Sequence, residues 1–480
     1  MAQPIIVWFR QDLRLSDNAA LEAAVASGAP IIPLFVLDDV SAGEWKLGSA
    51  SRWWLHHSLA SLANALIAKG SQIILRRGPA NEVVPAFVQE TRAAALHWSR
   101  GHDPVAKDLE PRIDTALAKL GVVARRFAGA LLFEPTDITT NAGVPFRVFT
   151  PFWRACLERP EPAEPRSAPR WLTTPINWPV SDVLEDWRLL PTSPDWAGGL
   201  RETWQPGEDG AKRRLAAFVK SALANYTTGR DRPDKDGTSQ LSPHLHFGEV
   251  SPSQCWHAAG RAIKSAPGAQ RGINSFRREL GWREFSAYLL YHWRDLPNVP
   301  FRAEFKSFPW KTDGQALVAW QRGQTGYPIV DAGMRQLWKT GWMHNRVRMI
   351  VASFLIKDLL IPWQTGEAWF WDTLVDADLA NNAQGWQWVA GSGADAAPYF
   401  RIFNPVTQGK THDPNGDYVR RFVPELKHLP VQHIHAPWNA PEDVLAEANI
   451  VLGSTYPRPI VDHALARRAA LTAFAALKER

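Results

Sequence analysis

The chain has 480 residues, roughly the length of two or three domains, and its 45% apolar and 21% charged residues are typical of a folded globular protein rather than a disordered one. No apolar run reaches the ~18 residues of a membrane span, and the N-terminus lacks a signal-peptide pattern, so we expect a cytoplasmic protein without membrane association. A net charge of +6 favours an anionic partner, and only two cysteines exclude a disulfide framework, a four-cysteine iron–sulfur cluster and a Cys-rich zinc site.

Residues 4–130 alternate short apolar runs with amphipathic ones, which predicts a parallel, doubly wound α/β sheet of the Rossmann-like type. Strands are expected at 4–10, 31–38, 71–77 and 94–99. Helices are expected at 18–27, with Asp17 as its cap, at 49–69 before Gly70, and at 103–120 before Gly121. Neither a G-x-G-x-x-G nor a P-loop motif follows a strand, so no dinucleotide or P-loop site is predicted here.

A connector and a helical region follow. Residues 158–206 contain nine prolines and little periodicity. From about residue 210 helical runs dominate, the last at 462–479, and no strand is expected. We therefore predict three parts: an α/β domain at 1–132, a connector at 133–205 and an all-α domain at 206–480.

Two polar segments admit both a structural and a ligand-binding interpretation. In 237–252, Ser242 and Ser251 each precede a proline and are expected to cap helices, while the hydroxyls of Thr238 and Ser239 could add to an anion site at such a helix start. In 374–393, two aspartates precede an Asn-Asn pair. A turn with Asp caps is the simpler interpretation there, and no further ligands at suitable spacing support a metal site.

Two helical faces are equally ambiguous. In 340–350, Trp342, Asn345, Arg346 and Met349 share one broad face, which is either solvated or able to hold a planar ligand beside a phosphate. In 276–285, Glu279, Trp282 and Arg283 of ELGWREF share a face. They form either a salt bridge or an acid beside a stacking surface in a pocket.

Taken together and in order, these segments resemble the DNA photolyase/cryptochrome family. The motifs that carry the resemblance are VWFRQDLRLSDNAAL near the N-terminus, TSQLSPHLHFGEVSP, ELGWREF, the block 323–363, DADLANNAQGWQW and DAAPYFRIFNP. They cover nearly the whole chain. The resemblance implies an α/β domain, a connector and a helical domain that holds FAD in a folded form.

The resemblance also implies how FAD is held. Tyr226 lies at the entrance of the flavin site, 238–242 hold the diphosphate, and Arg348 and Asp376 pair against the isoalloxazine ring. Asp378 bonds the ring or the ribitol side, and Asn382 faces flavin N5, where an uncharged amide supports the reduced, anionic flavin. The complete implied set is Tyr226, Thr238, Ser239, Gln240, Leu241, Ser242, Asn345, Arg348, Asp376, Ala377, Asp378 and Asn382.

The implied partner is UV-damaged DNA carrying a cyclobutane pyrimidine dimer, which must be flipped out of the duplex to be reached, and photolyases are among the enzymes known to flip bases in this way. Glu279 would bond a pyrimidine carbonyl, the indoles of Trp282 and Trp388 would hold the flipped bases, and arginines would bind flanking phosphates. The implied substrate and DNA residues are Arg230, Glu279, Trp282, Arg283, Asn345, Arg346, Met349, Trp388, Arg401 and Gln408.

The chain contains 24 tryptophans, and Trp386, Trp363 and Trp310 match the electron-transfer chain of the family. Most others, such as Trp53, Trp54 and Trp369, are expected to pack in the core.

The expected activity is that of a carbon–carbon lyase of the class I or III type. Excited, reduced FAD gives an electron to the dimer, the ring opens and the electron returns, with Glu279 and Asn382 as the catalytic residues. A blue-light photoreceptor is the alternative. Repair of (6-4) photoproducts is disfavoured because that branch has a histidine where Asn345 stands.

A second, antenna chromophore is also implied, with methenyltetrahydrofolate preferred over 8-hydroxy-5-deazaflavin. Its expected contacts are Glu44, Lys46 and Asp103, although Asp103 before Pro104 is also a good helix N-cap. We expect a monomer with no obligate protein partner and no metal.

Overall fold

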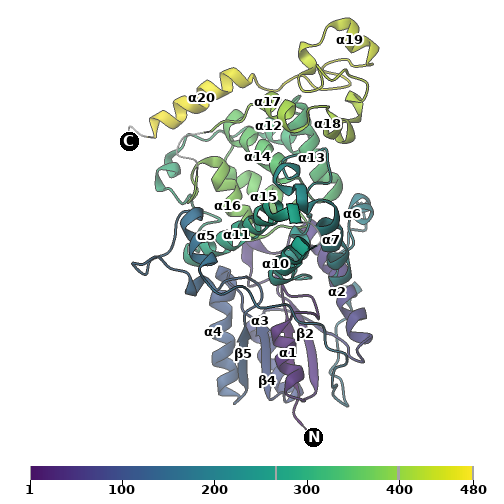
Figure 1. Ribbon diagram of the computed structural model, residues 1–480, viewed down its shortest axis with the longest axis vertical. Helices are drawn as coiled ribbons and strands as arrows, with labels where there is room; N and C mark the ends of the chain where they lie inside the picture. Colours follow the sequence, from purple (N-terminus) through teal and green to yellow (C-terminus); the bar gives the residue numbers. More distant parts are fainter. Residues whose placement is uncertain (1, 265–266, 397–400, 478–480) are drawn as a thin grey trace. The chain divides into compact units, whose positions relative to one another are not determined.

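The structure is a computed structural model that describes residues 2–264, 267–396 and 401–477 (Figure 1). Its backbone divides into two compact units. The first contains the chain up to residue 224 together with 239–294 and 375–379, and the second contains 225–238, 295–374 and the chain from 380 onward. The sequence-based boundaries at 132 and 205 follow composition instead, and they stay predictions.

A five-stranded parallel sheet forms the base of the first unit, in the order β3-β2-β1-β4-β5 (Figure 1). The strands are β1 (Ile5–Phe9), β2 (Ile31–Leu37), β3 (Ile74–Arg77), β4 (Ala95–Ser99) and β5 (Val123–Phe127). All five residues of β1 are buried, as a central strand covered on both faces requires. The predicted doubly wound sheet is therefore confirmed.

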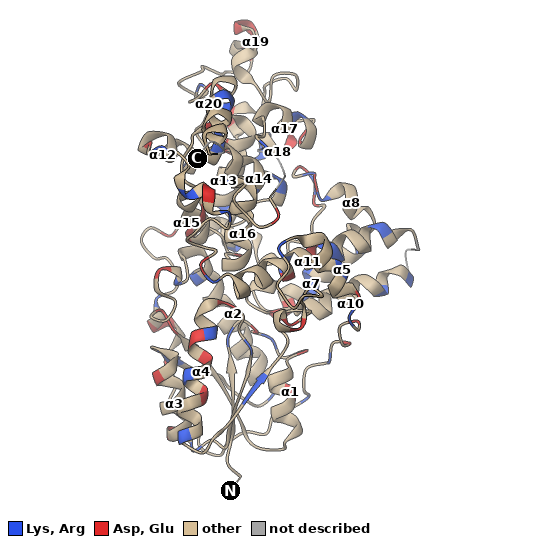
Figure 2. Cartoon of the chain, turned by 90° about the vertical axis from the view of Figure 1, so that its left-hand side faces the viewer, with Lys and Arg blue, Asp and Glu red and all other residues tan. Residues whose placement is uncertain are grey.

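Helices of the sheet's crossovers are α1 (Ala19–Ala26), α2 (Ser49–Ile67), α3 (Ala80–Thr91) and α4 (Pro104–Lys119). Acidic and basic residues are interspersed along α4, as expected of its solvated face (Figure 2). The core beneath contains Trp8 and Trp98, whose rings lie 6.2 Å apart. Trp53 and Trp54 of α2 are also buried, so these indoles are packing residues, as predicted.

Three local predictions were wrong. Strand β5 was not predicted, because it is an edge strand whose exposed valine and two arginines lack any apolar run. Asp17 does not cap α1, since its φ is +53° and Asn18 accepts the hydrogen bond from Leu21 N instead. Ser242 does not cap α9 (Ser242–His246), because it is already the first helical residue. Ser251 does cap its helix, in a capping box with Gln254.

The remaining helices of the first unit are α5 (Phe149–Leu157), α6 (Gly198–Thr203), α7 (Glu208–Ser221), α9, α10 (Pro252–Arg261) and α11 (Gln270–His292). Helix α11 packs closely on α5. A Cβ at Gly281 would lie 2.6 Å from the Trp153 ring, and Phe149 stacks on Trp282 with centroids 3.7 Å apart. Glycine at 281 is therefore what allows this close approach.

The second unit is helical, and its described residues contain no strand beyond one isolated bridge between Leu452 and Tyr456. Its helices are α8 (Tyr226–Gly229), α12 (Gly314–Gln321), α13 (Pro328–Thr340), α14 (Asn345–Ser353), α15 (Trp363–Thr373), most of α16 (Leu379–Ala390), α17 (Pro405–His412), α18 (Asp417–Phe422), α19 (Glu442–Glu447) and α20 (His463–Ala476). A π-helical turn, Phe354–Asp358, follows α14.

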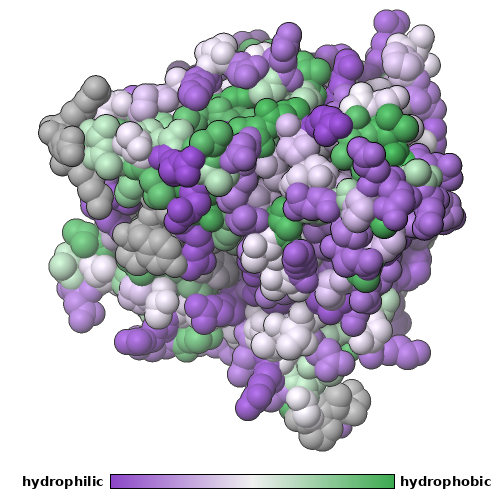
Figure 3. All heavy atoms as spheres, turned by 90° about the horizontal axis from the view of Figure 1, so that it is seen from above, coloured by the Kyte–Doolittle hydropathy of each residue, from purple (hydrophilic) through white to green (hydrophobic). Residues whose placement is uncertain are grey.

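Helix α20 lies within the predicted range 462–479, with Asp462 as its N-cap, and residues 478–479 of the predicted helix lie outside the described residues. Within the described ranges, no helix combines the length and apolarity needed to span a bilayer. Apolar side chains do reach the surface in patches among hydrophilic ones (Figure 3), as is normal for a folded protein.

Candidate functional site

In the first unit, the predicted diphosphate loop leads directly into α9. Gln240 in this loop has φ +50°, a left-handed conformation that is uncommon for a residue with a side chain. At the other end of α9, His246 Nδ1 lies 3.5 Å from Asp378 Oδ2. This contact brings the helix that follows the loop and the segment 376–378 to one place, as a shared cofactor site requires.

The two histidines of α9 differ in their surroundings. His244 is hydrogen-bonded to the buried Glu249, whose other carboxylate oxygen accepts a bond from Trp54 Nε1 at 2.9 Å. His246 is only 6% exposed, yet neither of its ring nitrogens has a hydrogen-bond partner within the described residues. His244 is thus part of the packing, whereas His246 presents unmatched polar atoms that the sequence reasoning did not single out.

In the second unit, Tyr226 is buried and Arg230 lies over its ring at 5.9 Å. The start of the predicted diphosphate loop passes directly over α8, since a Cβ at Gly237 would lie 2.5 Å from the Gly229 carbonyl oxygen. Only glycine permits that approach. Thr238 follows at once, so the backbone path of the loop is fixed at its origin.

Asn382 is buried on α16, and its Nδ2 donates to the Glu367 carbonyl oxygen at 3.0 Å. The bond fixes the amide orientation, and Oδ1 accepts no hydrogen bond from the described residues. A buried polar atom without a partner is costly. The two ring nitrogens of His246 are such atoms, and together with the oriented amide of Asn382 they fit a large polar cofactor such as FAD, each residue within its own unit.

Other predicted flavin residues are distributed over both units. Asn345 is exposed at the first position of α14, and Arg348 Nε donates to the Met343 carbonyl oxygen at 2.8 Å. Asp376 and Ala377 are buried in the first unit. The expected pairing of Arg348 with Asp376 would join the two units, and it stays a prediction.

On the predicted substrate side of the first unit, α11 carries Glu279, Trp282 and Arg283 on neighbouring turns, as predicted. The 3.7 Å stack on Phe149 holds the Trp282 ring at an interplanar angle of 8°. Arg283 Nη1 donates to Glu284 Oε1 at 3.3 Å. Two of the three side chains are thus fixed by neighbours in the same unit.

Glu284 is a neighbour that the sequence reasoning missed. It is 2% exposed, and its Oε2 accepts hydrogen bonds from Leu132 N at 2.7 Å and Phe133 N at 3.2 Å. Burial raises the pKa of this carboxyl group to about 7, against the lowering effect of Arg283 and the two N–H groups. Its role is to anchor the start of the connector to α11.

On the predicted DNA side of the second unit, Arg346 Nη2 donates to Asp231 Oδ1 at 2.8 Å, and Nη1 lies 3.8 Å from Met349 Sδ. Arg401 is exposed, and its carbonyl oxygen accepts from Lys357 Nζ. Arg346 and Met349 are therefore brought together, as predicted, while Asp231 is an unpredicted partner.

Trp388 and Gln408 lie on α16 and α17. Gln387, beside Trp388, is fully buried; its Nε2 donates to the carbonyl oxygens of Leu296 at 2.6 Å and Val299 at 3.0 Å, and its Oε1 accepts from Phe301 N at 2.8 Å. These bonds fix the rotation of α16, which carries both Trp388 and Asn382.

The three predicted electron-transfer tryptophans all lie in the second unit. Trp386 and Trp363 are 3% and 1% exposed, whereas Trp310 is half-buried. Trp386 contacts Phe370 edge-on at 5.0 Å, and Trp310 lies 4.3 Å from Phe308. Two of the three indoles are thus buried and the third reaches solvent, and their role in electron transfer stays a prediction.

The predicted antenna residues lie in the first unit. Glu44 and Lys46 are exposed at a 3₁₀ turn, Gly43–Trp45, and its C-cap. Asp103 caps α4, its Oδ1 accepting from Ala106 N at 2.9 Å. The simpler expectation for Asp103 is thus confirmed, and its antenna role stays a prediction.

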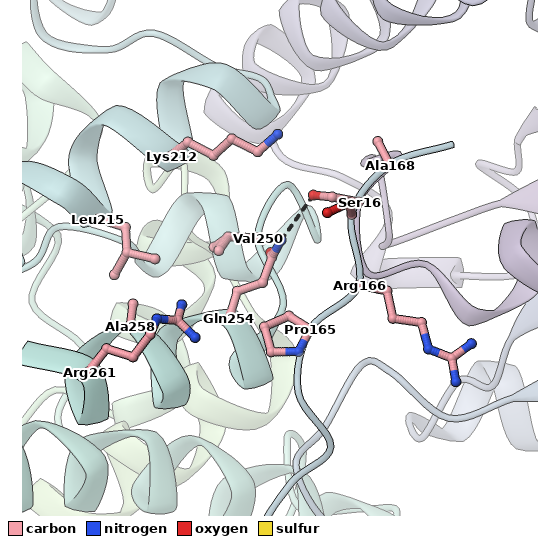
Figure 4. A pocket seen from close by; sticks show the side chains of 11 residues that line it. Ser16, Pro165, Arg166, Ala168, Lys212, Leu215, Val250, Gln254, Ala258 and Arg261 are labelled. Atoms are coloured by element: carbon pink, nitrogen blue, oxygen red, sulfur yellow. Dashed lines mark hydrogen bonds between the residues drawn. The ribbon is translucent and has the colours of Figure 1, made fainter. Parts of the chain in front are cut away.

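One pocket, of about 340 Å³, lies in the first unit between the connector at 165–168 and helices α7 and α10 (Figure 4). Its cations are paired with Glu22, Glu208 and Glu164, and Gln254 Nε2 donates to Ser16 Oγ at 2.9 Å. None of the predicted site residues lines it, so we assign it no ligand. The described residues also hold no cluster of three or more His, Cys, Asp or Glu side chains suited to a metal.

Comparison with known proteins agrees with these assignments of fold. The family model for DNA photolyase matches residues 5–170, and that for the FAD binding domain of DNA photolyase matches residues 276–476. A deoxyribodipyrimidine photo-lyase from Agrobacterium fabrum is 52% identical over 476 residues, which cover 99% of this chain and 98% of the relative.

Two further relatives span both branches of the predicted family. Cryptochrome-1 of Arabidopsis thaliana is 41% identical over 96% of this chain and 69% of its own length. The crystal structure of a bacterial class III photolyase from Agrobacterium tumefaciens is 51% identical, with a TM-score of 0.97 over 100% of this chain and 98% of that one. The chain belongs to the DNA photolyase/cryptochrome family, with an N-terminal α/β photolyase domain and a C-terminal FAD-binding domain.

Proposed function

We propose that the protein is a deoxyribodipyrimidine photo-lyase of the class III type, which repairs cyclobutane pyrimidine dimers in UV-damaged DNA under light. The 52% identity to a bacterial photo-lyase over nearly the full length of both chains carries this proposal. Reduced FAD, when bound, supplies an electron on illumination that splits the dimer and then returns.

The chain's own residues hold the flavin and favour its reduced state. The loop 238–242 provides hydroxyl and backbone N–H groups for the diphosphate. Asn382, fixed by its bond to the Glu367 carbonyl oxygen, would present Oδ1 to the ring. An amide carries no charge, so it does not oppose an anionic reduced flavin as a carboxylate would.

The lesion would be held by the indoles of Trp282 and Trp388 and by the carboxyl group of Glu279, which stabilises charge that arrives on the dimer. Because Trp282 is stacked on Phe149, its plane is set before the lesion arrives. Arg230, Arg283, Arg346, Arg401 and Gln408 would contact the DNA strand, and Asn345 and Met349 would line the pocket. Phosphate contacts of this kind weaken as salt concentration rises.

Electrons that reduce the flavin would pass through Trp386, Trp363 and Trp310, of which the first two are buried and Trp310 is half-buried. An antenna chromophore, preferably methenyltetrahydrofolate, would lie near Glu44, Lys46 and Asp103. We further propose a cytoplasmic monomer whose partner is damaged DNA.

The test is repair of a defined lesion. The purified protein is reduced, mixed with an oligonucleotide that carries one cyclobutane thymine dimer, and illuminated or kept dark. We expect thymines to be restored only in light, and Glu279→Ala and Asn382→Asp to lower the repair rate by roughly tenfold or more. An undiminished lesion beside stable flavin photoreduction would instead support a photoreceptor, the function suggested by the similarity to cryptochrome-1.

A further inference from the structure

Arg346, at the second position of α14, is held by one strong partner in this structure. Its Nη2 donates to Asp231 Oδ1 at 2.8 Å, and its only other contact is a weak one from Nη1 to Met349 Sδ at 3.8 Å. Nε is buried and has no hydrogen-bond partner within the described residues. Of the five N–H donors of the guanidinium, one bonds Asp231, one makes the weak contact with Met349 and the Nε–H is buried, so two Nη–H groups are left for an anion.

Asp231 also connects several segments of the second unit. Its carbonyl oxygen is bonded by His412 Nδ1, at the end of α17, at 3.0 Å. The preceding residue is Arg230, and α17 carries Gln408. Three of the residues proposed to bind DNA are therefore linked to Asp231 by a bond, a chain neighbour or a shared helix.

The ion pair of Arg346 and Asp231 is too exposed to contribute much to the stability of the fold. The side chains of Arg346 and Asp231 are 23% and 40% exposed. Ion pairs this accessible to water contribute little to stability. A carboxylate placed among phosphate-binding arginines also lowers their attraction for a polyanion, so its presence at this position needs another reason.

We infer that Asp231 is a positioning residue that makes Arg346 discriminate between lesion-bearing and undamaged DNA. Its carboxylate fixes the guanidinium in one orientation, so the remaining donors suit a phosphate at one place only. Its negative charge also opposes weak binding of phosphates in other positions. This inference rests on the proposed function, because it assumes that Arg346 contacts the DNA beside the flipped dimer.

The test measures binding in the dark, so photochemistry is not required. Kd values of Asp231→Asn and wild-type protein are compared for one duplex with and without a thymine dimer, across a salt series. We expect the affinity of Asp231→Asn for undamaged duplex to rise about threefold with a steeper salt dependence, since one carboxylate is gone. Lesion affinity should fall about threefold because Arg346 loses its fixed orientation, so discrimination falls about tenfold.

Asp195→Asn is the matched control, because Asp195 pairs with Arg201 at 2.6 Å, has a side chain 44% exposed, and neither member of this pair is among the residues proposed to bind DNA. We expect its discrimination to equal that of the wild type. Asp231→Glu keeps the carboxylate and should stay within about threefold of wild-type discrimination. Absorbance of bound FAD and thermal unfolding verify that each variant is folded.

A double-mutant cycle decides whether Asp231 acts through Arg346. In an Arg346→Gln background, Asp231→Asn should no longer change discrimination. The inference is overturned if Asp231→Asn changes both affinities by the same factor, changes neither, or lowers discrimination equally without Arg346. If the wild-type protein itself does not prefer the dimer, the proposed function fails instead.

Discussion

At the scale of single residues, the buried polar groups separate into those that are satisfied by the fold and those that are not. Glu249 and Gln387 are completely surrounded by their own donors and acceptors, and both serve packing. His246 is 6% exposed and neither of its ring nitrogens has a hydrogen-bond partner in the part of the chain that the structure describes, and Asn382, 9% exposed, bonds through its Nδ2 alone there. That difference distinguishes ligand-facing residues from structural ones of the same type.

Glu284 gives a prediction about pH. Its pKa in the fold is about 7, above the ordinary value of 4.5, so the folded protein keeps a proton that the unfolded chain releases as pH rises. The contribution of this group to stability is therefore present below about pH 4.5 and is lost as pH rises through 7. In urea unfolding from pH 5 to 8, we expect Glu284→Gln to gain about 3 kcal/mol relative to wild type.

The control for this effect is Glu90→Gln, since Glu90 is an exposed partner of Arg76 and should show no such trend. A difference between Glu284→Gln and wild type that stays constant across this pH range would show that the carboxyl group titrates normally. Unfolding is followed with a probe in the first unit, which contains Glu284.

At the scale of elements, the contact between α15 and α16 depends on one glycine. A Cβ at Gly366 would collide with the Trp386 ring and would lie 2.7 Å from Leu355 Cδ2. We expect Gly366→Ala to cost about 1–3 kcal/mol of unfolding free energy. It should also slow flavin photoreduction, because Trp386 must move. Urea unfolding and the rise of reduced-flavin absorbance under blue light measure the two effects.

Gly385 provides a matched control on α16, where an added Cβ meets nothing within 4 Å. Gly385→Ala should raise stability by about 0.5–1 kcal/mol, because alanine loses less conformational entropy than glycine in a helix. Photoreduction should be unchanged. Equal photoreduction rates in Gly366→Ala and wild type would show that the position of Trp386 does not limit electron entry.

The same elements show how far sequence reasoning reaches. Strands β1, β2 and β4 were predicted within a residue or so, because fully buried strands are continuous apolar runs. Strand β5 was missed, since an edge strand with two arginines gains its stability from pairing with β4 rather than from burial. The local sequence pattern thus identifies the central strands, and it fails for a strand whose formation depends on tertiary contacts.

The candidate site residues also divide into those that the sequence identifies and those that only the fold shows. Glu279, Trp282 and Arg346 could be named from the resemblance, as could Asn382. Asp231 and His246 could not, because what distinguishes them is visible only in the fold: Asp231 meets Arg346, 115 residues away along the chain, and His246 is buried with unbonded ring nitrogens. An aspartate in a charged, alternating segment such as RDRPDKD has no signal of its own. Only the fold shows that its carboxylate meets Arg346.

At the scale of the whole molecule, the path of the chain links the two units. It passes between them after residues 224, 238, 294, 374 and 379. The segment 375–379 belongs to the first unit although α15 and nearly all of α16, on either side of it, belong to the second. When one unit unfolds, it therefore frees the ends of segments that are still folded in the other unit. We expect the two units to unfold together.

The two cysteines test this coupling. Both belong to the first unit and are 0% exposed, and burial raises the pKa of the Cys255 thiol to about 12 and that of Cys156 further still. At pH 8 neither should react with a thiol reagent while the protein is folded, because the thiolate is the reactive form.

In a urea series, we expect labelling of both to begin at the concentration where α13 of the second unit loses its hydrogen-exchange protection. The variant Cys156→Ala assigns the signal to Cys255. Labelling while α13 remains protected would show that the first unit opens alone.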